Sequence, residues 1–170
     1  MKQHFQMFAA YNKWANGRIY DAAATLSPDE LERNMGAFFK SMIGTLNHMV
    51  AADRIWMKRF TGEGEAPTSL DAIIARDFAK LRTLREAEDA RIMKWIGSLK
   101  EKDLAGRFTY TTVSDMRTVS QRLAPALAHF FNHQTHHRGQ AHVLLTALGQ
   151  PSVVLDLIYF QRTEEGRAFA

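Results

Sequence analysis

The sequence predicts an all-α fold, a single four-helix bundle with a short β-hairpin before the last long helix. Four segments repeat apolar residues at intervals of three and four, the period of a helix that buries one face. With 46% hydrophobic and 24% charged residues, the 170-residue chain has the composition of an ordinary globular domain and is long enough for one core. Because no repeat, low-complexity tract or long linker divides the chain, we expect one domain over residues 1–170.

The first helix is predicted over residues 2–24, where aromatic and aliphatic residues recur at helical spacing. Ser27 and Pro28, followed by two acidic residues, form a helix-start signal, with serine as the N-cap and proline at the first helical position. Because Asn34 and Gly36 follow so soon, this signal opens only a short helical turn.

The second helix is predicted over about residues 41–60, with Ser41 as its N-cap. Its apolar residues lie on nearly all sides, which predicts a helix buried between neighbours. Residues 61–67 are a loop by composition. A charge-rich third helix is predicted from its cap at Ser69 to about Ser98. Its inner stripe is expected to hold Leu70, Ile73, Ile74, Phe78, Leu81, Leu84, Ile92 and Trp95.

Residues 107–120 break the helical period and predict a short hairpin. The stretch from Phe108 to Val113 is rich in strand-forming residues, and Ser114-Asp115 could turn the chain back into residues 116–119.

The last long helix is predicted over about residues 122–148, because Pro125 is tolerated in a first turn and the stretch from Gly149 to Pro151 ends a helix. One more short apolar stretch, residues 153–160, follows in the tail.

Charge and cysteine content exclude several classes of protein. The net charge is +4, but basic residues are interleaved with acidic ones along the chain, so no face for nucleic acid is expected. No cysteine is present, which excludes disulfide scaffolds, thiolate zinc sites, iron–sulfur clusters and thiol nucleophiles. Neither a signal peptide nor an apolar membrane span is evident, so we expect a cytoplasmic protein with no membrane partner.

Histidines are concentrated on the last helix, where five of the seven lie between His129 and His142. At about 100° per residue, His129, His133, His136 and His137 share one face, together with apolar residues that should face the core. His142 points to the opposite side. Because several histidines facing a core are costly unless they are hydrogen-bonded or bound to something, this cluster indicates a metal site.

Two histidines at positions i and i+4 project side by side, the spacing of two metal ligands from one helix. The pairs His129/His133 and His133/His137 both fit, and spacing alone does not choose between them. A third ligand must come from elsewhere, and His48 is a better candidate than His4, which lies near a frayed terminus.

The alternatives for a metal site are few. The chain has no Glu-x-x-His, the motif of di-iron bundles, and no His-Glu-x-x-His, the metalloprotease motif. What remains is a site of three histidines with open positions, which suits Zn, Ni, Co or Fe(II).

The segment from Asn132 to Gln140, with the sequence Asn-His-Gln-Thr-His-His-Arg-Gly-Gln, resembles the signature of the DinB family, part of the DinB/YfiT-like metalloenzyme superfamily. Tyr11–Asn16 and Asn47–Trp56 resemble the first two helices of this family, and Asp156–Phe160 resembles its tail.

This resemblance implies an up-down-down-up bundle with a crossover and a homodimer. It implies one divalent metal ion held by His48 on the second helix and by His133 and His137 on the last helix. His129 and His136 then lie beside the ligands or line the pocket. Asn47, Gln140 and Asp156 are candidates for hydrogen bonds that fix the imidazoles.

The leading functional hypothesis is a metal-dependent enzyme that acts on a small molecule. Relatives in the wider superfamily use a low-molecular-weight thiol, so the resemblance implies that the metal activates water or such a thiol, in a transferase-like or hydrolase-like reaction. We assign no catalytic base. The first alternative is a metal-binding, stress-response protein without catalysis. A damage-response protein that binds nucleic acid is a further alternative, suggested by the basic pI and the family name alone.

Overall fold

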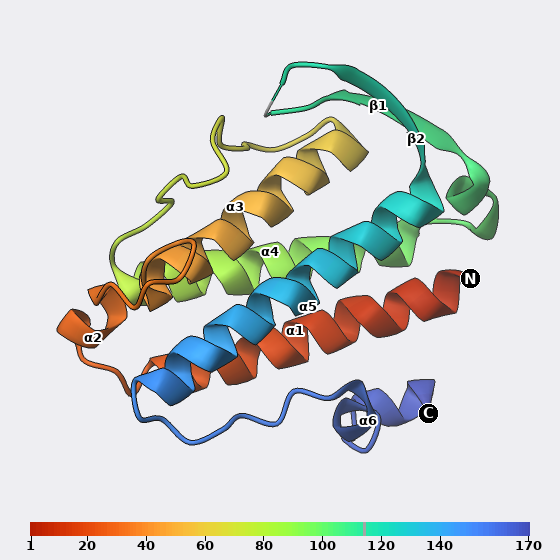
Figure 1. Cartoon of the computed structure of the whole chain (residues 1–170). Helices are drawn as coiled ribbons and strands as arrows, with labels where there is room; N and C mark the ends of the chain where they lie inside the picture. The colour runs from red at the N-terminus through yellow and green to blue at the C-terminus, as the bar shows by residue number, and fades with distance from the viewer. Residues whose placement is uncertain (114) are drawn as a thin grey trace.

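Four long helices lie side by side and form the bundle (Figure 1). They are α1 (Lys2–Ala23), α3 (Met42–Thr61), α4 (Phe78–Ser98) and α5 (Leu123–Ala147). The computed structural model describes residues 1–113 and 115–170. Helices α1 and α5 run in one direction and α3 and α4 run in the other, which is the predicted up-down-down-up order (Figure 1).

Local features mark both ends of α3, and the one at its start is the N-cap that the sequence predicts. At its start the amide of Gly44 donates to the Ser41 hydroxyl at 3.2 Å, so Ser41 is the N-cap. At its end Gly62 adopts a left-handed conformation with φ of 75°, which a residue with a side chain rarely adopts. The predicted short turn is α2 (Pro28–Glu32), where Ser27 and Glu30 form a capping box.

The predicted start of the third helix at Ser69 is wrong. Helix α4 begins at Phe78, and its N-cap is Asp77, whose carboxylate accepts from the amide of Lys80 at 2.7 Å. Leu70 and Ile73, expected in the core, are 47% and 46% exposed.

The crossover between α3 and α4 explains this difference. Both helices run in the same direction, so the chain must return along a helix of 20 residues, which is about 30 Å long. Helical residues rise only about 1.5 Å each, whereas extended residues span up to about 3.3 Å each. The crossover segment, residues 62–77, therefore stays mostly non-helical despite the helical spacing of its apolar residues.

The predicted hairpin is present as β1 (Arg107–Thr111) and β2 (Thr118–Arg122). The strands are antiparallel and pair Arg107 with Arg122 and Thr111 with Thr118. Of the predicted turn at Ser114-Asp115, Ser114 lies outside the described residues. A short 3₁₀ helix, η1 (Glu101–Ala105), leads from α4 into the hairpin.

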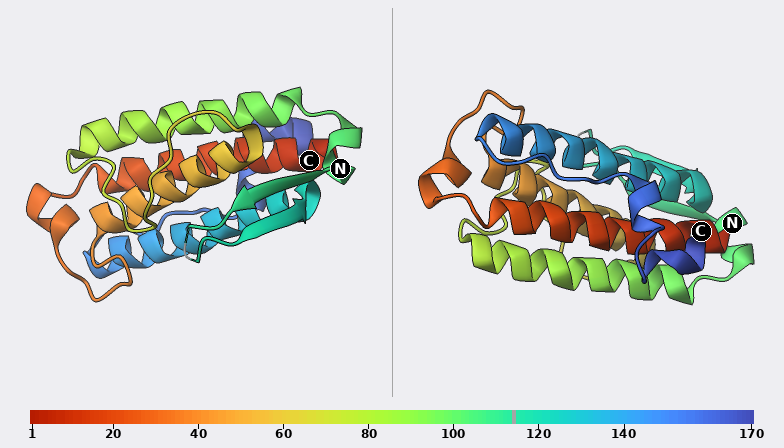
Figure 2. Two further views of the ribbon diagram at one scale, coloured as in Figure 1. Left: turned by 90° about the horizontal axis from the view of Figure 1, so that it is seen from above. Right: turned by 90° about the horizontal axis from the view of Figure 1, so that it is seen from below.

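The tail after α5 runs back along the bundle and brings the two termini to the same end (Figure 2). It contains α6 (Leu157–Phe160) and the 3₁₀ helix η2 (Gly166–Phe169). The Tyr11 hydroxyl donates to the Leu155 carbonyl at 2.7 Å, and the Phe160 ring is fully buried, so the tail is fixed to α1. In the part of the chain that the structure describes, no helix is long and apolar enough to cross a membrane.

Candidate metal centre

Three histidines converge between α3 and α5. His48 comes from α3, and His133 and His137 come from consecutive turns of α5. The Nε2 atom of His137 lies 3.1 Å from Nε2 of His48 and 3.1 Å from Nε2 of His133. One ligand atom from each side chain lies within 4.8 Å of the other two, a spacing that could hold one metal ion.

Hydrogen bonds on the outer nitrogens decide where two of these imidazoles carry their protons. Nδ1 of His48 lies 2.6 Å from the Leu70 carbonyl oxygen, which can only accept, so Nδ1 carries the hydrogen. Nδ1 of His137 donates to Oε1 of Gln140 at 2.8 Å. In the neutral rings, Nε2 of both residues therefore carries a lone pair that points toward the other.

The facing lone pairs on Nε2 of His48 and His137 fit a metal cation. Two lone pairs that face each other at 3.1 Å repel unless a cation lies between them. Neutral imidazole nitrogens are ligands that Zn, Ni, Co and Fe(II) accept readily.

The three rings are held in the neutral form that metal ligation needs. Burial lowers the pKa of His133 to about 3, with smaller contributions from the neighbouring histidines. Burial also lowers the pKa of His137 to about 4, although the hydrogen bond to Gln140 opposes this shift. The pKa of His48 is lowered by burial as well. Near neutral pH the rings therefore need not lose a proton before they bind a metal ion.

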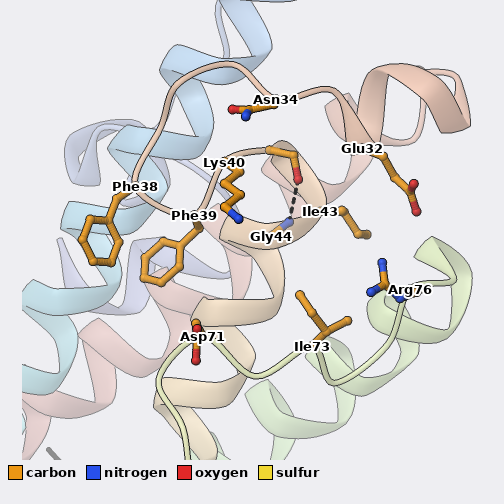
Figure 3. A pocket seen from close by; sticks show the side chains of 11 residues that line it. Glu32, Asn34, Phe38, Phe39, Lys40, Ile43, Gly44, Asp71, Ile73 and Arg76 are labelled. Atoms are coloured by element: carbon orange, nitrogen blue, oxygen red, sulfur yellow. Dashed lines mark hydrogen bonds between the residues drawn. The ribbon is translucent and has the colours of Figure 1, made fainter.

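A phenylalanine that the sequence analysis did not single out forms one wall of the centre. The Phe39 ring stacks on the His48 imidazole with centroids 3.9 Å apart and planes 16° apart, and its edge faces His137. Phe39 comes from the loop between α2 and α3, and it also borders a cavity of about 550 Å³. Figure 3 shows this cavity, with Phe38, Phe39 and Lys40 on the loop and Asp71 on the crossover segment. Two adjacent phenylalanines in a polar loop were the available sequence signal.

Asn47 acts on the centre indirectly. Its Nδ2 donates to the Ala75 carbonyl at 2.9 Å, and the Ala75 amide donates to its Oδ1 at 2.9 Å. These two bonds fix the crossover segment to α3, and the same segment supplies the Leu70 carbonyl that contacts His48. Asn47 therefore positions the backbone that orients His48.

Gln140 lies between two histidines. Its Oε1 accepts from His137, and its Nε2 lies 3.2 Å from Nε2 of His136. This places Gln140 where it can orient the imidazole of His137.

The expectation that four histidines of α5 face the core holds only in part. His137 is buried and His133 is half-buried, but His129 and His136 are exposed. These two lie at the margin of the apolar stripe, where the neighbouring helices no longer cover the surface. The His129 ring packs beside Trp56 at 5.1 Å and His133 at 5.8 Å. Burial and then the positive charge of Arg59 lower the pKa of His129.

Two further predicted residues lie in or against the tail. Asp156 is exposed and precedes α6, where its carbonyl accepts from the amides of Tyr159 and Phe160. In the described part of the chain its hydrogen bonds join it to this turn and not to the three histidines. His142, expected on the side of the helix opposite the other histidines, accepts from the Val153 amide at 3.1 Å and so helps to hold the tail.

A buried polar network beside the centre was missed from the sequence. Arg85 of α4 pairs with Asp53 of α3 at 2.7 Å and with Asp89 at 2.9 Å, and all three side chains are almost fully buried. Gln134, the residue after His133, donates to Asp53 and to the Met49 carbonyl. The signal was present as charged residues at core positions of the helical repeat, but those residues could equally have been solvated.

Comparisons with known proteins agree with this fold. The sequence profile of the DinB family matches residues 1–168. The chain is similar to Protein DinB of Bacillus subtilis (strain 168), with 22% identity over 161 residues that cover 91% of this chain and 94% of the relative. The crystal structure of a DinB-like protein from Bacillus cereus ATCC 10987 superposes with a TM-score of 0.66 at 18% identity, covering 85% of this chain and 90% of that one. This structural likeness supports the fold.

Proposed function

We propose, from the premise that the chain belongs to the DinB family, that it is a metal-dependent enzyme in which His48, His133 and His137 hold one divalent transition-metal ion. The observation that carries this proposal is the convergence of their Nε2 atoms, with the outer nitrogens of His48 and His137 already engaged. When bound, Zn, Ni, Co or Fe(II) would supply a Lewis acid that lowers the pKa of a water or of a low-molecular-weight thiol.

The residues around the histidines support this chemistry in distinct ways. Leu70 and Gln140 hold the imidazoles in the proton arrangement that leaves Nε2 free. Phe39 covers one face of His48 and keeps water away from it. Three neutral ligands leave the positive charge of a metal ion uncompensated, which is the condition for activating a bound water or thiol.

A small-molecule substrate and a homodimer belong to the same proposal. Because the chain has no cysteine, any thiol must arrive as a cosubstrate. Light scattering coupled to size-exclusion chromatography measures the mass of the particle, and a value near twice 19.3 kDa is expected.

Metal content tests the ligand set. Elemental analysis of protein purified without a histidine tag should find about one divalent metal ion per chain. His48→Ala and His133→Ala should each lose the metal. His142→Ala is the matched control, because His142 lies on the same helix as His133 but contacts the tail, and it should keep the metal. Retention of metal by His48→Ala would contradict the assignment.

Turnover tests the enzymatic part separately. The metal-loaded protein should convert members of a panel that combines low-molecular-weight thiols with electrophiles, or hydrolyse activated esters and amides. The metal-stripped protein and His133→Ala should not. Metal binding without turnover by any loaded form would favour the alternative, a metal-binding protein without catalysis.

A further inference from the structure

A second cavity, of about 440 Å³, lies between the end of α3, the crossover segment and the hairpin. We call it the Arg59 pocket. Among the described residues, its charged lining side chains are Lys58 and Arg59, and both are basic. Its apolar lining includes Ile55, Tyr110 and Met116. A pocket with this lining favours an occupant that has an anionic group and an apolar body.

Arg59 is held in place without an acidic partner. Its guanidinium lies 4.7 Å from the centroid of the Trp56 ring and 4.5 Å from that of the Tyr110 ring, and the two centroids are 5.5 Å apart, so both rings contact the group from the same side. In the described part of the chain, no hydrogen bond or ion pair engages its N–H groups. The two cation–π contacts hold the guanidinium beside the rings and leave its N–H groups free to donate to an occupant of the pocket.

Three other arginines on α3 and α4 differ in this respect. Each of them pairs with a carboxylate: Arg54 with Glu88, Arg85 with Asp53 and Asp89, and Arg91 with Glu88. A half-buried guanidinium that lacks such a partner is unusual and marks a place where an external anion would complete the pairing.

The Arg59 pocket lies in line with the three histidines. Positions 48, 52, 55 and 59 fall within about 60° of one another on α3, so Arg59 shares the face of His48 three turns further on, about 16 Å along the helix. On α5 the series His137, His133 and His129 runs the same way, and the His129 ring contacts Trp56. Long side chains on a helix lean toward its N-terminus, which brings the Arg59 guanidinium closer to His48 than its backbone is.

We propose that Arg59 binds the carboxylate of an elongated substrate whose apolar middle packs on Trp56, Ile55 and Tyr110 and whose other end reaches the three histidines. The guanidinium edge offers two parallel N–H donors, which match the two oxygens of a carboxylate. This inference deepens the proposed function, on which the placement of the far end rests, and it assigns the substrate to the class of amphipathic organic acids.

The first experiment uses the cobalt-loaded protein and two probes of similar length that end in a carboxylate or in a neutral hydroxyl. Mercaptohexanoate and mercaptohexanol both carry a thiol that changes the visible spectrum of a cobalt centre on binding. The wild-type protein should bind the acid roughly tenfold or more tightly, as expected for one charge-assisted pair of hydrogen bonds. Arg59→Gln should bring the two dissociation constants close to each other by weakening the acid alone.

Two further variants make the result specific. Lys58→Gln removes the neighbouring positive charge and should keep most of the preference for the acid. Arg59→Lys keeps the charge without the planar fork and should give an intermediate preference. If Lys58→Gln abolishes the preference and Arg59→Gln does not, or if the wild-type protein binds both probes equally, the proposal is wrong.

The second experiment separates this proposal from the metal proposal. The metal-free protein is titrated with hexanoate and hexanol while the indole signal of Trp56 is followed by NMR. Hexanoate should shift this signal at millimolar concentration, hexanol should shift it much less, and Arg59→Gln should remove the difference. Failure to bind cobalt would defeat the proposed function alone, whereas equal shifts by hexanoate and hexanol would defeat the role of Arg59.

Discussion

Single hydrogen bonds decide which ring nitrogen carries the proton in two of the three histidines. The proton on Nδ1 of His48 is directed to a backbone carbonyl, and that of His137 is directed to a side-chain amide oxygen. Such partners fix both the tautomer and the plane of a metal-ligating imidazole. The Leu70 carbonyl belongs to the backbone and cannot be removed by substitution, whereas the Gln140 side chain can. Gln140 therefore allows a test of whether the outer hydrogen-bond partner orients the imidazole.

Gln140→Ala should weaken metal binding by roughly 10–100-fold, the usual effect of removing the outer partner of a ligating histidine. Gln140→Glu keeps an acceptor at the same position and should retain most of the affinity. His136→Ala is the control, because His136 contacts Gln140 but offers no atom to the histidine group. Calorimetric titration with zinc measures all four proteins, and an unchanged affinity in Gln140→Ala would show that Gln140 does not orient His137.

At the level of secondary structure, the crossover segment links the end of α3 and the start of α4 to the candidate metal centre. It begins at Gly62, supplies the Leu70 carbonyl to His48, bonds to Asn47 through Ala75, and ends at Asp77, the N-cap of α4. Its conformation therefore determines both where α4 begins and how His48 is oriented.

The N-cap of α4 gives a direct test of its boundary. Asp77→Ala should lower the free energy of unfolding by about 0.5–2 kcal/mol, because the Lys80 amide loses its acceptor. Ser69→Ala should change stability much less, since Ser69 lies in the crossover segment and not at a helix start. Urea denaturation measures both variants. A larger loss of unfolding free energy in Ser69→Ala than in Asp77→Ala would indicate that the helix begins at Ser69, as the sequence predicted.

Removing the Asn47 side chain should lower the free energy of unfolding more than removing the side chain of an exposed asparagine. Asn47→Ala leaves the buried amide and carbonyl of Ala75 without partners, which should cost about 1–3 kcal/mol and weaken metal binding as Leu70 loosens. Asn34→Ala removes an exposed bond to Gly36 and is the matched control. Equal stability losses in the two variants, measured by urea denaturation, would mean that Asn47 does not anchor the segment.

The elements that were predicted correctly are those whose signal is local. Ser41 marks the start of α3, and the strand-forming residues from Phe108 mark the hairpin, because capping and strand propensity act over a few residues. The start of α4 was missed because its cause is the direction of α3, which the residues near Ser69 do not encode.

In the candidate site too, local patterns predicted some features, and the rest depend on the fold of the whole bundle. Spacing identified two pairs of histidines on α5, but only the fold brings His133 and His137 to His48 and leaves His129 at the surface. Phe39 and the Leu70 carbonyl reach the centre from segments whose paths depend on the whole bundle, so no local pattern could reveal them.

At the scale of the whole molecule, a buried polar layer joins the four long helices. Asp53 of α3 and Asp89 of α4 flank Arg85, and Asn16 of α1 donates to Asp89 at 3.0 Å. Arg138 of α5 completes the layer through the side-chain oxygen of Asn16. This layer specifies which helix faces which, because each buried charge requires its partner at one height in the bundle.

Removal of Arg85 should therefore be far more costly than removal of a similar exposed arginine. Arg85→Met leaves Asp53 and Asp89 buried without their cation and should cost about 3–5 kcal/mol of unfolding free energy. Arg82→Met is the matched control on the same helix. Arg82 also contacts two carboxylates, at 2.6 and 3.0 Å, but these pairs are exposed and should be worth less than about 1 kcal/mol each.

The pH dependence of the Arg85→Met variant identifies the cause of its instability. Burial raises the pKa of Asp53 from 3.8 to about 7, and the positive charge of Arg85 opposes this rise, so the pKa should be higher still without Arg85. A carboxyl group whose pKa is raised in the folded state stabilises the fold while it is protonated and loses that contribution as the pH rises through the folded pKa. The deficit of Arg85→Met relative to the wild-type protein should therefore be smaller near pH 5 than near pH 8. Urea denaturation at the two pH values measures it, and a deficit that stays constant or shrinks as the pH rises would show that lost packing of the arginine stem, and not an unpaired carboxylate, destabilises the bundle.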